Sequence, residues 1–266
     1  MDDETRLARA RTFDEIAELY DAGRREVPAF ILDDLFALTG IDSATARILE
    51  IGCGTGQATL PLARRGCEIV CIELGANLAR IARQKLEPFP KVTVINSGFE
   101  QWQPSGAPFD IVLAVTSWHW VDPRVRYAKA AAVLRPRGFL AFTTGGHACP
   151  PGFDPFFNEI QECYQDLGYS LPRWPFPPPE ETPDSRDEIE QSGFFDEVKV
   201  ARHVWTEEFT ADQHVAMMNT ASDHRQMAPE KRERLFAEMR RLHDARPSGR
   251  VTKHNFTILH VARKKM

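Results

Sequence analysis

Residues 48–60 read Ile-Leu-Glu-Ile-Gly-Cys-Gly-Thr-Gly-Gln-Ala-Thr-Leu, and this stretch decides the fold. A short apolar run ends at Glu50 and Ile51, three glycines follow at alternate positions, and a helical pattern begins near Ala58. Glycine lets the backbone turn sharply and approach a ligand closely because it has no Cβ. The stretch therefore predicts a strand, a tight turn and a helix N-terminus, with a small ligand bound on the turn.

The spacing and charge of this turn indicate which ligand it holds. A dinucleotide-binding turn is G-x-G-x-x-G and holds a pyrophosphate at a helix N-terminus, whereas this turn is G-x-G-x-G. Glu50, just before the first glycine, would repel a pyrophosphate and favour a positive centre. Glu73 ends the next strand pattern, about 20 residues past the loop, where an acidic side chain can accept both ribose hydroxyls. A cationic head and a nucleoside tail predict S-adenosylmethionine and argue against an NAD-dependent oxidoreductase.

Further motifs follow the glycine loop in chain order. They are Glu73, Ser97-Gly98-Phe99-Glu100, Phe109-Asp110-Ile111-Val112 and Val133-Leu134-Arg135-Pro136-Arg137-Gly138. Together with Glu50-x-Gly52-x-Gly54-x-Gly56, they resemble the ordered motifs of class I S-adenosylmethionine-dependent methyltransferases, in particular the type 11 group, over approximately residues 13–146. The resemblance implies an α/β, Rossmann-like, seven-stranded and mostly parallel sheet with helices on both faces and an antiparallel last strand. It also implies S-adenosylmethionine as cofactor and S-adenosylhomocysteine as product.

The chain is expected to be a single methyltransferase domain spanning residues 1–266. Its predicted parts are N-terminal cap helices at 1–45, a cofactor-binding core at 46–146, a proline-rich connection at 147–195, and the last two strands at 196–266 with a helical insertion at 211–246. Strands alternating with helices predict a parallel sheet whose ligands bind outside the carboxyl ends of the strands. The fifth, sixth and seventh strands are predicted at 139–143, 198–205 and 256–262.

Composition narrows the class of protein. A chain of 266 residues with 42% hydrophobic residues can bury one large α/β core, and no run of about 20 apolar residues occurs. The N-terminus, Met1-Asp2-Asp3-Glu4, lacks the basic and then apolar layout of a secretory signal. We therefore expect a cytoplasmic monomer or homodimer with no membrane partner. A net charge of −5 offers no broad basic surface for a nucleic acid.

The five cysteines form no C-x-x-C pair. Cys67 and Cys71 lie four positions apart, but Cys71 falls within a strand pattern and no second pair of cysteines or histidines accompanies them. We therefore expect buried free thiols and no metal site.

The cofactor-binding candidates come from the loop, from the strand ends and from the resemblance. They are Tyr20, Arg24, Glu50, Gly52, Cys53, Gly54, Gly56, Glu73, Leu74, Gly98, Phe99, Glu100, Thr116, Ser117 and Trp118. The resemblance implies that Phe99 stacks on the adenine and that Glu100 accepts from its exocyclic amine. It also implies that the segment carrying Tyr20 and Arg24 closes over the cofactor. The alternative for these two residues is a core aromatic and a solvated arginine.

Three residues are candidates for catalysis: His119, Tyr20 and Arg225. His119 lies in Trp118-His119-Trp120, just past the fourth strand, where aromatic rings can hold a sulfonium or exclude water. The alternative is that both tryptophans and His119 belong to the core. Arg225 ends a polar stretch of the insertion and could hold a substrate carboxylate, or lie in an ordinary interhelical loop. A hydrolase triad is not favoured because no G-x-S-x-G turn occurs.

These patterns predict an enzyme that transfers a methyl group from S-adenosylmethionine to a small molecule, with a carboxylate or hydroxyl as a candidate acceptor. Proximity, orientation and exclusion of water would supply most of the rate, so a general base is optional. The alternatives are a non-catalytic S-adenosylmethionine-binding regulatory protein and, less favoured by the charge, a methyltransferase acting on protein or nucleic acid. The inserted helices at 211–246 are expected to cover the acceptor pocket.

Overall fold

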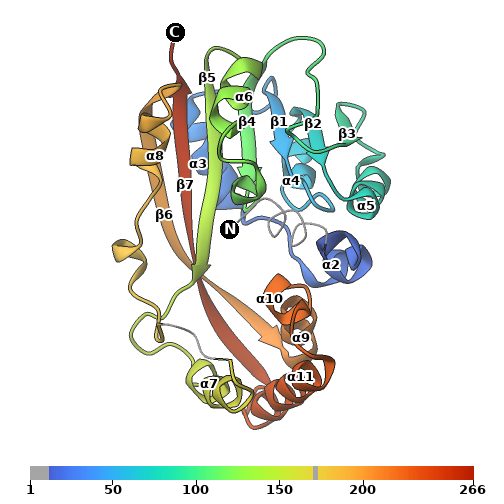
Figure 1. The fold of residues 1–266 in the computed structure, drawn as a ribbon, viewed down its shortest axis with the longest axis vertical. Coiled ribbons are helices and arrows are strands. Elements are labelled where there is room, and N and C mark those ends of the chain that lie inside the picture. The colour runs from blue at the N-terminus through green and yellow to red at the C-terminus, as the bar shows by residue number, and fades with distance from the viewer. Residues whose placement is uncertain (1–11, 170–172) are drawn as a thin grey trace. The chain divides into compact units, whose positions relative to one another are not determined.

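The computed structural model of the chain describes residues 12–169 and 173–266. In these residues one sheet has seven strands in the order β3-β2-β1-β4-β5-β7-β6 (Figure 1). The strands are β1 (Arg47–Ile51), β2 (Glu68–Glu73), β3 (Val92–Asn96), β4 (Phe109–Val115), β5 (Leu134–His147), β6 (Phe195–Thr210) and β7 (Arg250–Lys264). The pairs β1/β2, β1/β4, β2/β3 and β4/β5 are parallel, and β7 is antiparallel. The predicted Rossmann-like sheet is confirmed.

Helices cover both faces of the parallel part of the sheet, whose strands are apolar on both sides. The helices of the described residues are α2 (Ala17–Gly23), α3 (Ala29–Thr39), α4 (Thr59–Arg64), α5 (Ala76–Leu86), α6 (Arg126–Val133), α7 (Phe156–Asp166), α8 (Arg186–Gln191), α9 (Ala211–Met218), α10 (Ser222–Arg225) and α11 (Pro229–Asp244), with short 3-10 helices η1 (Trp118–Trp120) and η2 (Pro179–Glu181). Those packed on the parallel strands are α3, α4 and α5 on one face and α6 and α8 on the other. Successive strand residues point to opposite faces. In β1, Ile48 accordingly packs with residues of α3, α4 and α5, and Leu49 packs with residues of α6 and α8.

The last three strands are longer than their apolar cores. Strand patterns at 139–143, 198–205 and 256–262 underestimate β5, β6 and β7 because most of the remaining residues are charged, polar or glycine. Gly145 lies in the part of β5 that follows the predicted strand. A Cβ at this position would lie only 2.4 Å from the Phe256 carbonyl oxygen, so glycine lets β5 approach β7 closely.

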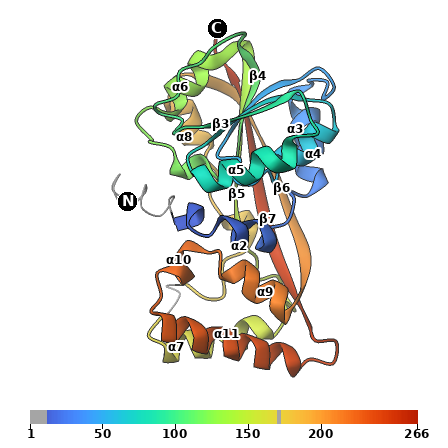
Figure 2. The same ribbon diagram turned by 90° about the vertical axis from the view of Figure 1, so that its right-hand side faces the viewer.

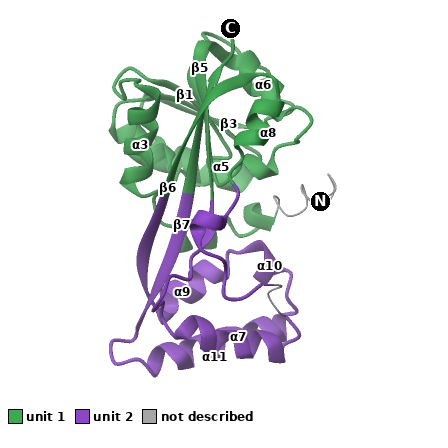
Figure 3. Cartoon of the chain, turned by 90° about the vertical axis from the view of Figure 1, so that its left-hand side faces the viewer, with its two compact units in different colours: residues 1–144, 184–202, 258–266 green, residues 145–183, 203–257 purple. Residues whose placement is uncertain are grey.

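Contacts divide the chain into two compact units (Figure 3). The first contains residues 1–144, 184–202 and 258–266, and the second contains residues 145–183 and 203–257. The second unit thus combines the predicted helical insertion with most of the predicted proline-rich connection. Residues 1–11 of the predicted N-terminal cap and residues 170–172 of the connection lie outside the described residues.

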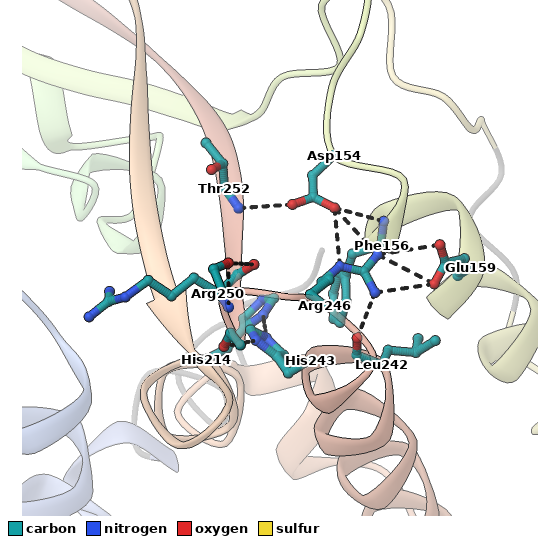
Figure 4. A network of polar contacts seen from close by, with 11 residues as sticks. Asp154, Phe156, Glu159, His214, Leu242, His243, Arg246, Arg250 and Thr252 are labelled. Atoms are coloured by element: carbon teal, nitrogen blue, oxygen red, sulfur yellow. Dashed lines mark hydrogen bonds and ion pairs between the residues drawn. The ribbon is translucent and has the colours of Figure 1, made fainter.

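The second unit has its own apolar core, shared by α7, α9 and α11, and its own polar network (Figure 4). The Arg246 guanidinium lies 3.4 Å from the Asp154 carboxylate and 3.3 Å from Glu159, and it donates to the Leu242 carbonyl at 2.6 Å. Asp154 also accepts a hydrogen bond from the Thr252 backbone N–H at 3.1 Å. One arginine therefore joins the end of α11 to the start of α7, and Asp154 joins both to β7.

All five cysteines are free thiols, and four of them are buried. In the described part of the chain, no helix is long and apolar enough to cross a bilayer. The same residues contain no group of three or more His, Cys, Asp or Glu side chains arranged to hold a metal ion.

Candidate active site

The glycine loop after β1 has the geometry that its sequence predicts. Gly52, Gly54 and Gly56 all have positive φ angles, of 68°, 59° and 98°. This region of backbone conformation is strained for residues with a Cβ. At Gly52 a Cβ would also lie 2.8 Å from the Cβ of Ser117. Glycine therefore brings the loop against the turn that follows β4.

Glu73 ends β2 and joins it to the glycine loop. Its carboxylate is 6% exposed and accepts hydrogen bonds from the backbone N–H of Gly54 at 2.9 Å and of Gly75 at 2.8 Å. Burial raises the pKa of Glu73 to about 7, although these two hydrogen bonds act to lower it. The side chain lines a cavity beside the loop.

Glu50 has a different environment. It is 2% exposed and accepts a hydrogen bond at 2.7 Å from the Thr59 hydroxyl, at the start of α4. Burial raises the pKa of Glu50 to about 7, partly opposed by the Thr59 hydrogen bond. Glu50 is not among the residues that line the cavity. Glu50 therefore stabilises the glycine loop by linking β1 to α4, the two elements that flank the loop.

The cavity has a volume of about 270 Å³ and lies at the carboxyl ends of β1, β2, β3 and β4. This is the edge at which open parallel sheets bind ligands. Its lining residues are Phe13, Tyr20, Arg24, Ile51, Gly52, Gly54, Ile72, Glu73, Leu74, Leu78, Ser97, Gly98, Phe99, Glu100, Val115, Thr116, Ser117, His119, Trp120 and Val121. Segments far apart in the sequence, from the N-terminal region to the turn after β4, thus meet around one space.

Most of the predicted site residues meet at this cavity. Those that line it are Tyr20, Arg24, Gly52, Gly54, Glu73, Leu74, Gly98, Phe99, Glu100, Thr116, Ser117 and His119. Five predicted site residues do not line it: Glu50, Cys53, Gly56, Trp118 and Arg225.

Two of these five have a clear structural position. Cys53 is a buried part of the loop, with 3% of its surface exposed. Trp118 is equally buried in the core, where it stacks on Phe142 at 5.4 Å between ring centroids and meets Tyr127 edge-on. Of the two tryptophans beside His119, the cavity is therefore lined by Trp120.

The turn after β3 supplies an aromatic and an acidic side chain. Phe99 lines the cavity and packs parallel to Trp102, with ring centroids 6.4 Å apart. Glu100 accepts a hydrogen bond from the Asp122 backbone N–H at 2.9 Å, which ties this turn to the segment after β4. Phe99 and Glu100 thus form one wall of the cavity.

The turn after β4 carries a strained residue and a histidine. Thr116 has a positive φ of 52°, and its N–H donates to the Thr143 hydroxyl at 3.0 Å. Such strain in a residue other than glycine is concentrated at functional sites. Ser117 donates to the Ile51 carbonyl, which fixes the start of η1. His119 follows, and burial together with the positive charge of Arg126 lowers its pKa, so the imidazole is neutral at neutral pH.

The N-terminal segment closes one side of the cavity. Tyr20 and Arg24 lie on or next to α2, and the Arg24 guanidinium is 5.5 Å from the centroid of the Tyr20 ring. Burial raises the pKa of Tyr20, partly opposed by Arg24, so the phenol keeps its proton at neutral pH. Phe13 meets both Tyr20 and Trp120 edge-on, at 5.7 and 5.9 Å. Phe13 was missed as a site residue because its place in a helical pattern indicates only a core aromatic.

Helix α2 lies beside α5 (Figure 2). An acidic side chain of the N-terminal segment also binds the start of α5. Asp14 accepts hydrogen bonds from the backbone N–H groups of Asn77 at 2.7 Å and Leu78 at 3.1 Å. These are orphan donors of the first turn of α5, and Gly75 at its N-cap has no side chain to satisfy them. Asp14 thus caps a helix more than 60 positions away and fixes the wall that contains Phe13.

Arg225 lies at the end of α10 in the second unit, and its guanidinium is 3.5 Å from the Asn219 side-chain oxygen. In the same unit, the His224 ring bonds to the Tyr164 hydroxyl at 2.6 Å and to Asp223 at 3.0 Å. The side chains of this polar stretch thus make these contacts within the second unit.

Comparison with known proteins shows which proteins the chain resembles. Residues 48–138 match a family model described as a methyltransferase domain. The chain is 30% identical over 129 residues to an uncharacterised methyltransferase of Mycobacterium tuberculosis, covering 48% of this chain and 50% of that protein. It is 32% identical over 159 residues to a malonyl-[acyl-carrier protein] O-methyltransferase of Geobacter sulfurreducens, covering 59% and 56%. The chain thus spans about half the length of these relatives.

Solved structures agree on the fold. A SAM-dependent methyltransferase from Geobacter sulfurreducens in complex with S-adenosylhomocysteine has a TM-score of 0.53 at 15% identity, covering 93% of this chain and 96% of that one. Phosphoethanolamine N-methyltransferase 2 of Haemonchus contortus has a TM-score of 0.56 at 15% identity, covering 100% and 61%. The fold is the Rossmann-like α/β fold of these solved structures. Residues 48–138 match the methyltransferase domain, as the motifs in this part of the chain predict.

Proposed function

We propose that the protein transfers a methyl group from S-adenosylmethionine to a small molecule whose acceptor atom is an ionisable oxygen, as in a carboxylate or hydroxyl. The observation that carries this proposal is the cavity between the glycine loop and His119. One cavity is lined both by Glu73, an acidic side chain suited to a ribose, and by His119, a neutral imidazole. The match of residues 48–138 to a methyltransferase domain supports the same reaction class.

Each side of the cavity suits one part of the cofactor. Glu73 has carboxylate lone pairs for the ribose hydroxyls, and Phe99 and Glu100 suit the adenine ring and its amine. Gly52 and Gly54 bring backbone close to the methionine portion. Tyr20, Arg24, Thr116 and Ser117 complete this end, where an arginine can pair with the cofactor's carboxylate.

The acceptor end is assigned to His119. A neutral imidazole can take a proton from a hydroxyl or orient a carboxylate by donating a hydrogen bond. Malonyl-[acyl-carrier protein] O-methyltransferase and a magnesium-protoporphyrin O-methyltransferase, which is 33% identical over 115 residues, are both named for transfer to oxygen. These names support an oxygen acceptor for this chain.

The reaction needs little covalent chemistry from the protein. The acceptor oxygen attacks the methyl carbon in line with the carbon–sulfur bond, which breaks and leaves its electron pair on sulfur. An anionic oxygen and a cationic sulfonium become neutral, so charge disperses in the transition state. Holding the two reactants in line and excluding water can together supply about 7 to 11 kcal/mol of the barrier. His119 would add the removal of a proton where the acceptor is a hydroxyl.

The test is methyl transfer to an unbiased set of acceptors. The full chain is incubated with S-adenosylmethionine labelled on the methyl group and with pools of small carboxylic acids, hydroxylated compounds and amines. We expect the label in a methyl ester, which alkaline hydrolysis releases as methanol, or in a methyl ether, which resists that treatment. Labelling should be lost with Glu73→Ala. S-adenosylhomocysteine binding without any labelled product would indicate a regulatory S-adenosylmethionine-binding protein instead. Label only in amines would overturn the oxygen acceptor.

A further inference from the structure

Arg126 begins α6 and reaches back to the turn that carries His119. Its side chain is only 12% exposed. One guanidinium nitrogen donates to the Trp118 carbonyl at 3.2 Å, within η1. The guanidinium carbon also lies 5.4 Å from the centroid of the Trp118 ring and 5.3 Å from that of Tyr127. A planar cation in contact with two aromatic rings is a rigid anchor, and a lysine could not reproduce its geometry.

A second element fixes the other end of the guanidinium. Glu188 in α8 forms an ion pair with Arg126, 62 positions away in the sequence and in the same unit. Arg126 therefore joins three segments: the turn after β4, the start of α6 and α8. The guanidinium keeps one orientation because one of its nitrogens binds the Trp118 carbonyl and another binds the Glu188 carboxylate.

The positive charge of Arg126 acts on His119. Burial is the larger cause of the lowered pKa of His119, and the charge of Arg126 is the second. Other ionisable groups face the same cavity: Tyr20 and Arg24 from the N-terminal segment, Glu73 from β2 and Glu100 from the turn after β3. Asp122 and Arg124, which follow η1, pair with each other at 2.7 Å.

We propose that Arg126 is a positioning residue for the methyl transfer: it anchors the turn that carries His119 and places a positive charge on the carbonyl of Trp118, the residue before His119. The inference rests on the proposed function, since it gives His119 the acceptor-facing role. The anchor fixes where the imidazole points. The charge disfavours a proton on the imidazole and favours an anionic acceptor oxygen next to it.

The first test measures His119 directly, without turnover. Histidine Cε1 signals are followed by NMR against pH in the full chain, and the His119 signal is assigned by its absence in His119→Gln. Arg126→Gln removes the charge and is expected to move the His119 titration to higher pH. Glu188→Gln leaves Arg126 uncompensated and is expected to move it to lower pH. Arg64→Gln, an equal loss of charge at an exposed arginine of α4 whose partner Glu26 is also exposed, is the matched control and should leave the titration unchanged.

The second test separates the anchor from the charge. Arg126→Lys keeps the charge, so His119 should still titrate at the same low pH. We expect kcat to fall roughly tenfold or more, because the turn is misplaced. An unshifted His119 titration in both Arg126→Gln and Glu188→Gln overturns the electrostatic part. Full kcat in Arg126→Lys overturns the anchoring part. If Arg126→Gln does not fold, Glu188→Gln alone decides the first question.

The two proposals fail differently. If no acceptor is ever methylated, the proposed function fails while the NMR titrations still report whether Arg126 acts on His119. If methylation is found but Arg126→Gln leaves both the titration and the pH profile of turnover unchanged, the function holds and the role of Arg126 is wrong.

Discussion

The carboxylate of Glu73 accepts a hydrogen bond from the backbone N–H of Gly54 at 2.9 Å, across 19 positions of the chain. The other carboxylate oxygen accepts from Gly75 at 2.8 Å. Each oxygen has two lone pairs, so both can still accept from a ligand. The end of β2 thus holds the glycine loop in shape and offers hydrogen-bond acceptors at the cavity.

Glu73→Ala should weaken cofactor binding by about tenfold or more, because a hydrogen bond to a charged group contributes about 1.5 to 3 kcal/mol. The measurement is calorimetric titration with S-adenosylhomocysteine. The melting temperature without ligand is the control, since Gly54 also loses its partner. Unchanged affinity would show that Glu73 does not contact the ribose.

The raised pKa of Glu73 also predicts a pH dependence of binding. With a pKa of about 7, much of the unliganded protein carries a protonated Glu73 at pH 6. Ribose hydroxyls donate best to the ionised form, so the dissociation constant for S-adenosylhomocysteine should fall as pH rises from 6 to 8. Glu73→Gln should remove this dependence. An equal dependence in Glu73→Gln would assign the titration to another group.

Glu50→Gln should stabilise the unliganded protein at high pH. The folded-state pKa of Glu50 is about 7, above the ordinary value of 4.5, so folding takes up a proton between these two values. The contribution of Glu50 to stability is complete below pH 4.5 and is lost as pH rises through 7, a change of about 3 kcal/mol. Glutamine can still accept from Thr59. Urea unfolding should therefore show a gain for Glu50→Gln at pH 8 and almost none at pH 4.5, and a constant difference would contradict the burial argument.

The sequence predicted those parts of the site that depend on backbone conformation and on the ends of strands. Gly52 and Gly54 could be assigned because only glycine adopts their φ angles without strain, and Glu73 because it ends an apolar strand at the expected interval. The sheet followed from strands and helices that alternate at regular spacing. These features depend on a few neighbouring residues, which one sequence reveals.

Side-chain direction could not be read in the same way. Glu50 and Trp118 lie beside the site in sequence yet point to Thr59 and into the core, because neighbouring residues in a strand or a tight turn face opposite ways. Phe13 reaches the cavity only because α2 packs against α5, which is a tertiary contact without a local signal. The division into two units was equally hidden, since β5, β6 and β7 run through both.

Asp14→Ala should loosen the N-terminal wall of the cavity. It removes the cap of α5, worth about 1 kcal/mol, and frees the segment that carries Phe13 and Tyr20. We expect faster dissociation of S-adenosylhomocysteine in stopped-flow fluorescence. Gly75→Ala should act alike, because its Cβ would lie 2.6 Å from the Asp14 carboxylate.

Glu18→Ala is the matched control for this change. Glu18 also joins α2 to α5, through Arg80, but the pair is largely exposed and contributes about 0 to 1 kcal/mol. Equal effects of Asp14→Ala and Glu18→Ala would mean that general charge loss in the N-terminal segment, not the cap, controls dissociation.

His119→Ala should reduce turnover on the true acceptor, and the pH profile should show how His119 acts. Its lowered pKa keeps the imidazole neutral at pH 7. A base role therefore predicts constant turnover near neutrality and a fall only below about pH 6.5, with cofactor binding unaffected. An orienting role predicts a similar loss in His119→Ala with little dependence on pH, because alignment then supplies the rate. His119→Asn, which keeps a hydrogen-bond donor without a titrating ring, should retain activity in the orienting case and lose it in the base case. Full turnover in His119→Ala, with only a lower melting temperature, would make His119 a core histidine.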